Sequence, residues 1–234
     1  MPITLLDHIS SKEKDATIEK LFSHSSPSQD FFLMVSLSVI MATFGLLIDS
    51  PMIVIGSMLI APILYPILSL SMGIVMSDRK VIGRTLLTLG TAIVYASITS
   101  VVLTILFGDG TRSNATAVYS QALPSLPHVI VAVVAGFAAA FALVKPQLSE
   151  MLPGIAISVS LIPPLAAVGI GIASIDFALA RGALLLFIIN LVGIVFAGMF
   201  VFSLMNFYAK KTVAREVLQE EEKELKKENE KQGK

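Results

Sequence analysis

The chain has 234 residues, of which 55% are hydrophobic and 15% are charged, and its mean hydropathy is +0.82. Soluble domains carry about 25% charged residues, so this composition indicates that lipid is the main solvent. The formal net charge is zero, which argues against a basic nucleic-acid-binding surface. The lack of cysteine excludes disulfides and thiolate chemistry, and the three histidines lack metal-ligand spacing, so we expect no metal and no cofactor.

Residues 1–30 are predicted to be a short polar segment on the cytoplasmic side. The stretch 1–29 lacks the apolar core and the cleavage site of a signal peptide. The first apolar stretch is therefore expected to act as its own insertion signal.

Six apolar stretches follow, each close to the roughly 20 residues that a membrane-spanning helix needs. They are 31–49, 52–76, 82–107, 128–145, 151–174 and 178–206. The predicted fold is an all-α integral membrane protein with six transmembrane helices. Short connections supply helix caps, namely Asp49 or Ser50 before Pro51, then Asp78, then Asp176. Residues 108–127 are predicted to form an extracytoplasmic loop.

Lysine and arginine are distributed unevenly between the two predicted sides of the membrane. One side receives Lys12, Lys14, Lys20, Arg79, Lys80, Arg84, Lys145, Lys210, Lys211 and Arg215, and the other receives Arg112 and Arg181. By the positive-inside rule both termini are cytoplasmic, in a multi-pass protein of the cell membrane.

The charged tail, 207–234, is predicted to be a cytoplasmic helix. Leu218 and Leu225 are seven residues apart, but no sustained heptad surrounds them. A solvated helix with Glu–Lys pairs is favoured, and a short coiled coil between subunits is the alternative.

An internal repeat relates two proline-containing segments. Shifting the chain by 101 residues aligns SMLIAPIL (57–64) with SVSLIPPL (158–165). Each half, 31–107 and 128–206, then holds three spans with the proline-broken helix in the middle. Because three is odd, the two halves enter the membrane in opposite orientations, as in transporters with inverted repeats.

Each proline removes a backbone donor and costs a helix interior about 3 kcal/mol. We expect this to free the carbonyls of Met58, Pro62, Val159 and Ser160 for a solute, unless the breaks are packing kinks. The candidate substrate-binding residues are Ser57, Met58, Pro62, Tyr65, Pro66, Ser158, Val159, Ser160, Pro163 and Pro164. Asp49 and Glu150, at span ends, are candidates for gating or coupling.

The segments GSMLIAPILYPIL (56–68), SDRK with Arg84, and ISVSLIPPLAAVGIGIA (157–173) resemble a known family. It is the family of uncharacterised hydrophobic membrane proteins called domain of unknown function 389. The resemblance covers roughly 31–205 and implies a multi-pass prokaryotic membrane protein without supplying a substrate.

The predicted function is a membrane transporter or channel for a small solute or ion, bound near mid-membrane where the two broken helices meet. The alternative is a non-transporting scaffold or signalling module that acts through its charged tail. An enzyme is not expected, because a nucleophile with its base and paired mid-span carboxylates are missing. Gly136-x-x-x-Ala140 and Gly193-x-x-x-Ala197 allow close helix packing, and we expect a homo-oligomer in the lipid bilayer.

Overall fold

The computed structural model describes residues 10–108, 116–152, 154–155 and 160–232, and every regular element assigned within them is helical. Four helices are long and apolar enough to cross a membrane: α2 (Gln29–Leu47), α5 (Arg79–Phe107), α7 (Leu126–Val144) and α10 (Phe177–Leu204). A bent pair, α3 (Pro51–Ile60) and α4 (Leu64–Val75), makes a fifth crossing if it counts as one span. These helices confirm the all-α prediction and indicate a membrane protein.

The fifth predicted span, 151–174, is the one that differs most from expectation. Its described part contains helix α9 (Ile162–Ala173), whose 12 residues are too short to cross a bilayer. Residues 153 and 156–159 lie outside the described residues, so six spans remain a prediction. The remaining elements are α1 (Ser11–His24), α6 (Thr116–Ser120), η1 (Pro146–Met151), η2 (Phe207–Lys210) and α11 (Lys211–Gln232).

Three corners between helices share one backbone design. In each, a residue with positive φ precedes the N-cap of the next helix, and the cap N–H donates to the carbonyl of a glycine five residues earlier. The glycine, positive-φ and cap residues are Gly45, Asp49 and Ser50 at α2–α3; Gly73, Ser77 and Asp78 at α4–α5; and Gly171, Ile175 and Asp176 at α9–α10. A glycine is needed because the next helix passes close by: a methyl group on Gly171 would lie 2.7 Å from the Ala180 nitrogen.

The helices of the two halves match in length. Helices α2 and α7 both have 19 residues, α4 and α9 both have 12, and α5 and α10 have 29 and 28. The second member of each pair begins 97 or 98 residues after the first, as for Gln29 and Leu126, Leu64 and Ile162, and Arg79 and Phe177. The starts of α4 and α9 are thus 98 residues apart, which differs by three from the shift of 101 residues predicted from sequence; a shift of 98 places Pro66 on Pro164, whereas the shift of 101 places Pro62 on Pro163.

The halves exchange contacts across the middle of the bundle. Helix α5 packs on α9, and α10 packs on α4. Gly169 of α9 lies against Ser100 of α5, and Gly198 of α10 lies against Ser71 of α4. Since Gly169 follows Ser71 by 98 residues and Gly198 follows Ser100 by 98, the same contact occurs twice with the halves exchanged.

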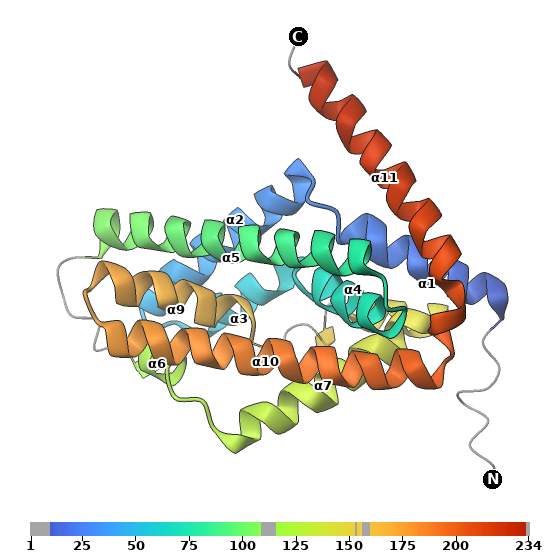
Figure 1. The fold of residues 1–234 in the computed structure, drawn as a ribbon. Coiled ribbons are helices and arrows are strands. Elements are labelled where there is room, and N and C mark those ends of the chain that lie inside the picture. Colours follow the sequence, from blue (N-terminus) through green and yellow to red (C-terminus); the bar gives the residue numbers. More distant parts are fainter. Residues whose placement is uncertain (1–9, 109–115, 153, 156–159, 233–234) are drawn as a thin grey trace.

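The two ends of the bundle differ in charge. At one end, here called the basic end, α1, the α4–α5 corner and the start of α11 meet, and the α9–α10 corner lies at the opposite end, here called the far end (Figure 1). Two ion pairs join the segments of the basic end: Lys210 with Asp15 at 2.7 Å, and Arg215 with Asp78 at 2.6 Å. The C-terminal part of α11 extends away from the bundle (Figure 1).

Candidate functional site

The first break lies between α3 and α4, which are bent by 52°. Pro62 has no N–H to donate to the carbonyl of Met58. Pro66 is the third residue of α4, within the first turn, where the lack of an N–H leaves no intrahelical bond unmade. The carbonyl of Pro62, which we expected to be free, accepts from the Tyr65 N–H at 3.3 Å.

Ser57 lies on α3 and is fully buried. Its hydroxyl donates to the Val54 carbonyl at 2.6 Å, and its own carbonyl accepts from the Ser38 hydroxyl at 2.6 Å. This is the back-bonding that serines commonly make inside helices. Met58 is half-buried beside it.

A pocket of about 270 Å³ opens beside the first break at the basic end. Its lining includes Ser23, His24, Asp30 and Pro62. The His24 ring stacks on the Tyr65 ring with 4.8 Å between centroids, so α1 covers this break. Sequence reasoning missed this role of His24, because no pattern in α1 announces a contact with a residue 41 positions later.

The second break precedes α9. Pro163 and Pro164 are the second and third residues of α9, so they begin this helix instead of interrupting it. Ser158 and Val159 lie outside the described residues. The carbonyl of Ser160, which Pro164 cannot bond, accepts from Asn190 Nδ2 at 2.7 Å. Asn190 lies on α10 and is 3% exposed.

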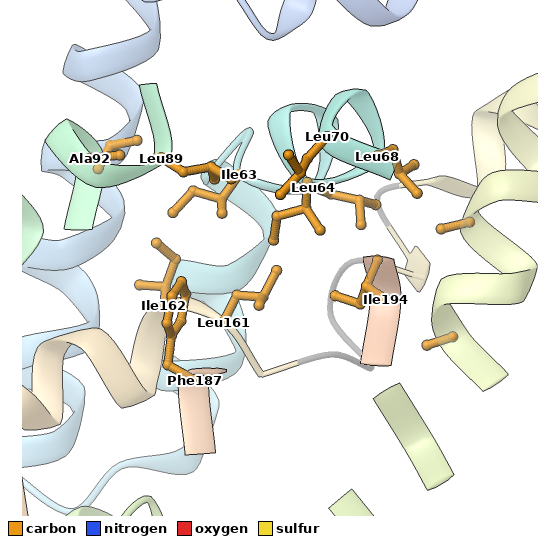
Figure 2. Close-up of a cluster of buried hydrophobic side chains, with 14 of the residues drawn as sticks. Ile63, Leu64, Leu68, Leu70, Leu89, Ala92, Leu161, Ile162, Phe187 and Ile194 are labelled. Carbon is orange, nitrogen blue, oxygen red and sulfur yellow. The ribbon is translucent and has the colours of Figure 1, made fainter. Parts of the chain in front are cut away.

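The two breaks face each other through apolar side chains (Figure 2). Ile63 and Leu64 of the first break point toward Leu161 and Ile162 of the second, and all four are at most 5% exposed. Each residue of the second pair follows its counterpart by 98 residues. The contact between the two described segments is dry, where we expected polar groups, and we call these four residues the apolar crossing.

The two carboxylates predicted to gate or couple lie at the surface, apart from the apolar crossing. Asp49 is an exposed positive-φ residue of the α2–α3 corner, and Ser50 is the N-cap of α3. Glu150 is exposed within η1. Within the described part of the chain, no group of three His, Cys, Asp or Glu side chains is placed to hold a metal.

Asp78 and Asp176 cap α5 and α10, as predicted, and each also accepts a hydrogen bond from a residue distant in sequence. Asp78 Oδ1 accepts from the Lys80 N–H at 3.0 Å while Oδ2 accepts from Arg215 at 2.6 Å. Burial acts to raise the pKa of Asp78, but the bonds from Arg215 and from backbone N–H groups outweigh it and hold that pKa below its ordinary value. Asp176 Oδ2 accepts from the Tyr119 hydroxyl at 3.1 Å.

Four apolar helices of membrane-spanning length indicate a helical membrane protein. The chain belongs to the family described as domain of unknown function (DUF389), whose model matches residues 58–196. It is 30% identical over 178 residues to an uncharacterized protein of Methanocaldococcus jannaschii, covering 75% of this chain and 54% of that protein. The chain thus spans about half the length of this relative. No solved structure matches the chain.

Proposed function

We propose that the protein is a transporter or channel for a small solute, with the apolar crossing as its closed gate. The observation that carries the proposal is the crossing itself: two broken segments, 98 residues apart, face each other at equivalent positions. Interrupted helices at matching places in two halves are typical of transporter binding sites.

The proposal includes two inverted three-helix repeats in the cell membrane, with both termini in the cytoplasm. The matching helix lengths and the exchanged Ser–Gly contacts support a duplicated unit. Equivalent corners, α4–α5 and α9–α10, lie at opposite ends of the bundle, which supports inversion (Figure 1). The concentration of Lys and Arg at the basic end supports a cytoplasmic location for that end.

The gate is expected to be closed by packing alone. The side chains of the apolar crossing lie in one buried cluster with Leu68, Leu89 and Phe187. Water and polar solutes are excluded from such a constriction until the two breaks separate. The bent α3–α4 pair and the short α9 are the elements whose ends can move without breaking a continuous helix.

A permeability measurement tests the proposed function. The protein is reconstituted into liposomes, and the influx of urea, glycerol and potassium is followed for the wild type and for an Ile63→Ala/Leu161→Ala variant. We expect the wild type to exceed empty liposomes for at least one probe and the variant to exceed the wild type. Leu87→Ala is the matched control, because Leu87 of α5 is 68% exposed and lies outside the apolar crossing. Permeability equal to that of empty liposomes for every protein would overturn the proposal.

We also propose a homo-oligomer in the bilayer. Helix α5 leaves large apolar side chains uncovered, including Ile105 and Leu87, each 68% exposed. Either lipid or a second copy can cover this face. Native mass spectrometry from detergent distinguishes the two, and a purely monomeric spectrum would contradict the oligomer.

The alternative function, a scaffold or signalling module acting through the tail, is favoured by one observation. Arg215 and Leu218 hold the first half of α11 against the bundle, while the C-terminal part of the helix projects from it (Figure 1). Truncation after Leu225 separates the two functions. A transporter is expected to keep its flux, whereas a signalling module is expected to lose its partner.

A further inference from the structure

A short segment covers the second break at the far end. This segment is 119–122: its first two residues end α6, and the other two follow that helix. Tyr119 donates its hydroxyl to Asp176, and the Ala122 carbonyl lies directly against Gly182 of α10. Gln121, between them, accepts a hydrogen bond at Oε1 from the Ser160 hydroxyl at 3.2 Å.

Gln121, Ser160 and Asn190 form a chain of uncharged hydrogen-bonding groups, here called the amide cluster. Asn190 donates to the Ser160 carbonyl, and the Ser160 hydroxyl donates to Gln121. Ser160 and Gln121 are both half-buried. The three residues of the amide cluster come from three separate segments, so tertiary packing and not a local turn brings them together.

The first break has different residues at the positions that correspond to Asn190 and Ser160. Positions 98 residues earlier hold Ala92 in place of Asn190 and Pro62 in place of Ser160. Ala92 is 1% exposed and lies beside Leu89 and Ile63 at the crossing (Figure 2). The side chains that correspond to Asn190 and Ser160 therefore cannot form this hydrogen-bond chain at the first break.

The chemistry of the amide cluster selects a neutral ligand. A cation needs several free oxygens, but the Ser160 carbonyl already accepts from the Asn190 amide. An anion needs a cationic or multiple-donor partner, and the three side chains carry no charge. In the structure the Ser160 hydroxyl donates its hydrogen bond to a carboxamide oxygen, that of Gln121.

We propose that the second break binds a small uncharged solute that carries a carboxamide or urea group, and that the Gln121 side chain occupies this place in the closed state. A solute entering from the far end replaces Gln121 as the acceptor of the Ser160 hydroxyl. Asn190 positions Ser160 by holding its carbonyl. The claim that such a solute is transported rests on the proposed function, whereas the claim that the second break binds it does not.

Chemical rescue tests the binding site without any flux. Gln121→Ala is expected to lower the folded-to-unfolded ratio about fivefold, the effect of one neutral hydrogen bond, seen as a lower Tm by circular dichroism in detergent. Millimolar acetamide is expected to restore the Tm of this variant and to leave the wild type unchanged, since its own carboxamide fills the site. Acetate and ethylammonium, which match acetamide in size but carry charge, are expected to give no rescue.

Two further variants keep this test sharp. Leu123→Ala, at a 70% exposed neighbour, controls for changes in the segment as a whole. Gln121→Glu keeps an acceptor oxygen in a side chain of the same length and is expected to show no response to acetamide. Equal responses of wild type and Gln121→Ala to acetamide, rescue by acetate or ethylammonium, or the absence of rescue would each overturn the proposed site.

Flux supplies the second readout. In liposomes, Gln121→Ala is expected to raise urea and acetamide permeability about fivefold over wild type, with potassium permeability unchanged. Potassium permeability that rises as much as that of urea would overturn the neutral-solute assignment. If no protein moves any probe while acetamide still rescues Gln121→Ala, the site stands and the transporter proposal fails.

Discussion

Replacing either of the two crossing glycines, Gly169 and Gly198, by alanine tests the exchanged contacts directly. A methyl group on Gly169 would lie 2.7 Å from the Ser97 carbonyl oxygen and 2.7 Å from Ser100 Oγ. On Gly198 it would lie 2.7 Å from Ser71 Oγ and 2.9 Å from Ser71 Cβ. These neighbours are backbone or Cβ-anchored atoms, so the helices have to separate.

Overpacking of this kind costs about 1–3 kcal/mol. Alanine recovers up to about 1 kcal/mol because it favours the helix over glycine. Because an added methyl group at either glycine would have contacts under 3.0 Å, we take the upper part of the overpacking range, about 2–3 kcal/mol, so the net loss is about 1–2 kcal/mol for each variant. The larger value is expected for Gly169, which meets a backbone oxygen, and in a chain of this length such a loss lowers Tm by about 2–8 °C.

The assay is thermal unfolding by circular dichroism in detergent, with Gly83→Ala and Gly90→Ala as matched controls. Both control glycines lie on α5 with nothing within 4 Å of an added methyl group, so their Tm should stay the same or rise. The reciprocal exchange Ser71→Gly with Gly198→Ser should recover most of the wild-type Tm by rebuilding the contact in reverse. If the crossing and control variants melt together, the close α4–α10 and α5–α9 contacts do not exist.

Three further variants probe the ends of the bundle and the second break. Asp78→Asn is expected to lose about 1–3 kcal/mol of stability with the charged bond to Arg215. The pKa of Asp78 is held below its ordinary 3.8, so this stabilisation exists above that pH and disappears as pH falls through the folded-state pKa. The difference in Tm between wild type and variant should therefore vanish in acid. Asn190→Leu, close in volume, leaves the Ser160 carbonyl without its donor and should cost about 1–3 kcal/mol, measured as Tm. Truncation after Leu225 should leave Tm unchanged, because it keeps Gln219 and Glu222, which line a pocket with Arg84, and removes only the projecting end of α11.

Features encoded in neighbouring residues could be predicted from the sequence. The caps of α5 and α10 were found because Asp78 and Asp176 each precede a long apolar run, and local spacing is enough to identify such caps. The break at Pro62 was predicted for the same reason. Both depend on interactions within a few residues, which composition and order specify directly.

The register of the repeat could not be read in the same way. The shift of 101 residues was chosen to match Ser57 and Pro62 with Ser158 and Pro163. The structure aligns α4 with α9 at 98, because the glycine corners and helix lengths set the register. Apolar segments tolerate several alignments, whereas a backbone corner tolerates one.

The hydrogen-bond donors to the freed carbonyls also could not be predicted from the sequence. Proline identifies which carbonyl loses its donor, but the replacement comes from wherever tertiary packing brings one. For Ser160 it is Asn190, 30 residues away on another helix. For Pro62 it is the N–H of Tyr65, supplied by local geometry at the start of α4.

The Ser–Gly contacts restrict the residues that can stand at these four positions. Each contact pairs one serine with one glycine: Ser71 with Gly198, and Ser100 with Gly169. Serine on both sides would clash at these distances, and glycine on both sides would leave a void, so each contact needs one residue of each kind. The proposed recognition of solute resides instead at the second break, where the Ser160 hydroxyl meets Gln121. Asn190, which positions Ser160 there, has an alanine 98 residues earlier, so the first break does not repeat this arrangement.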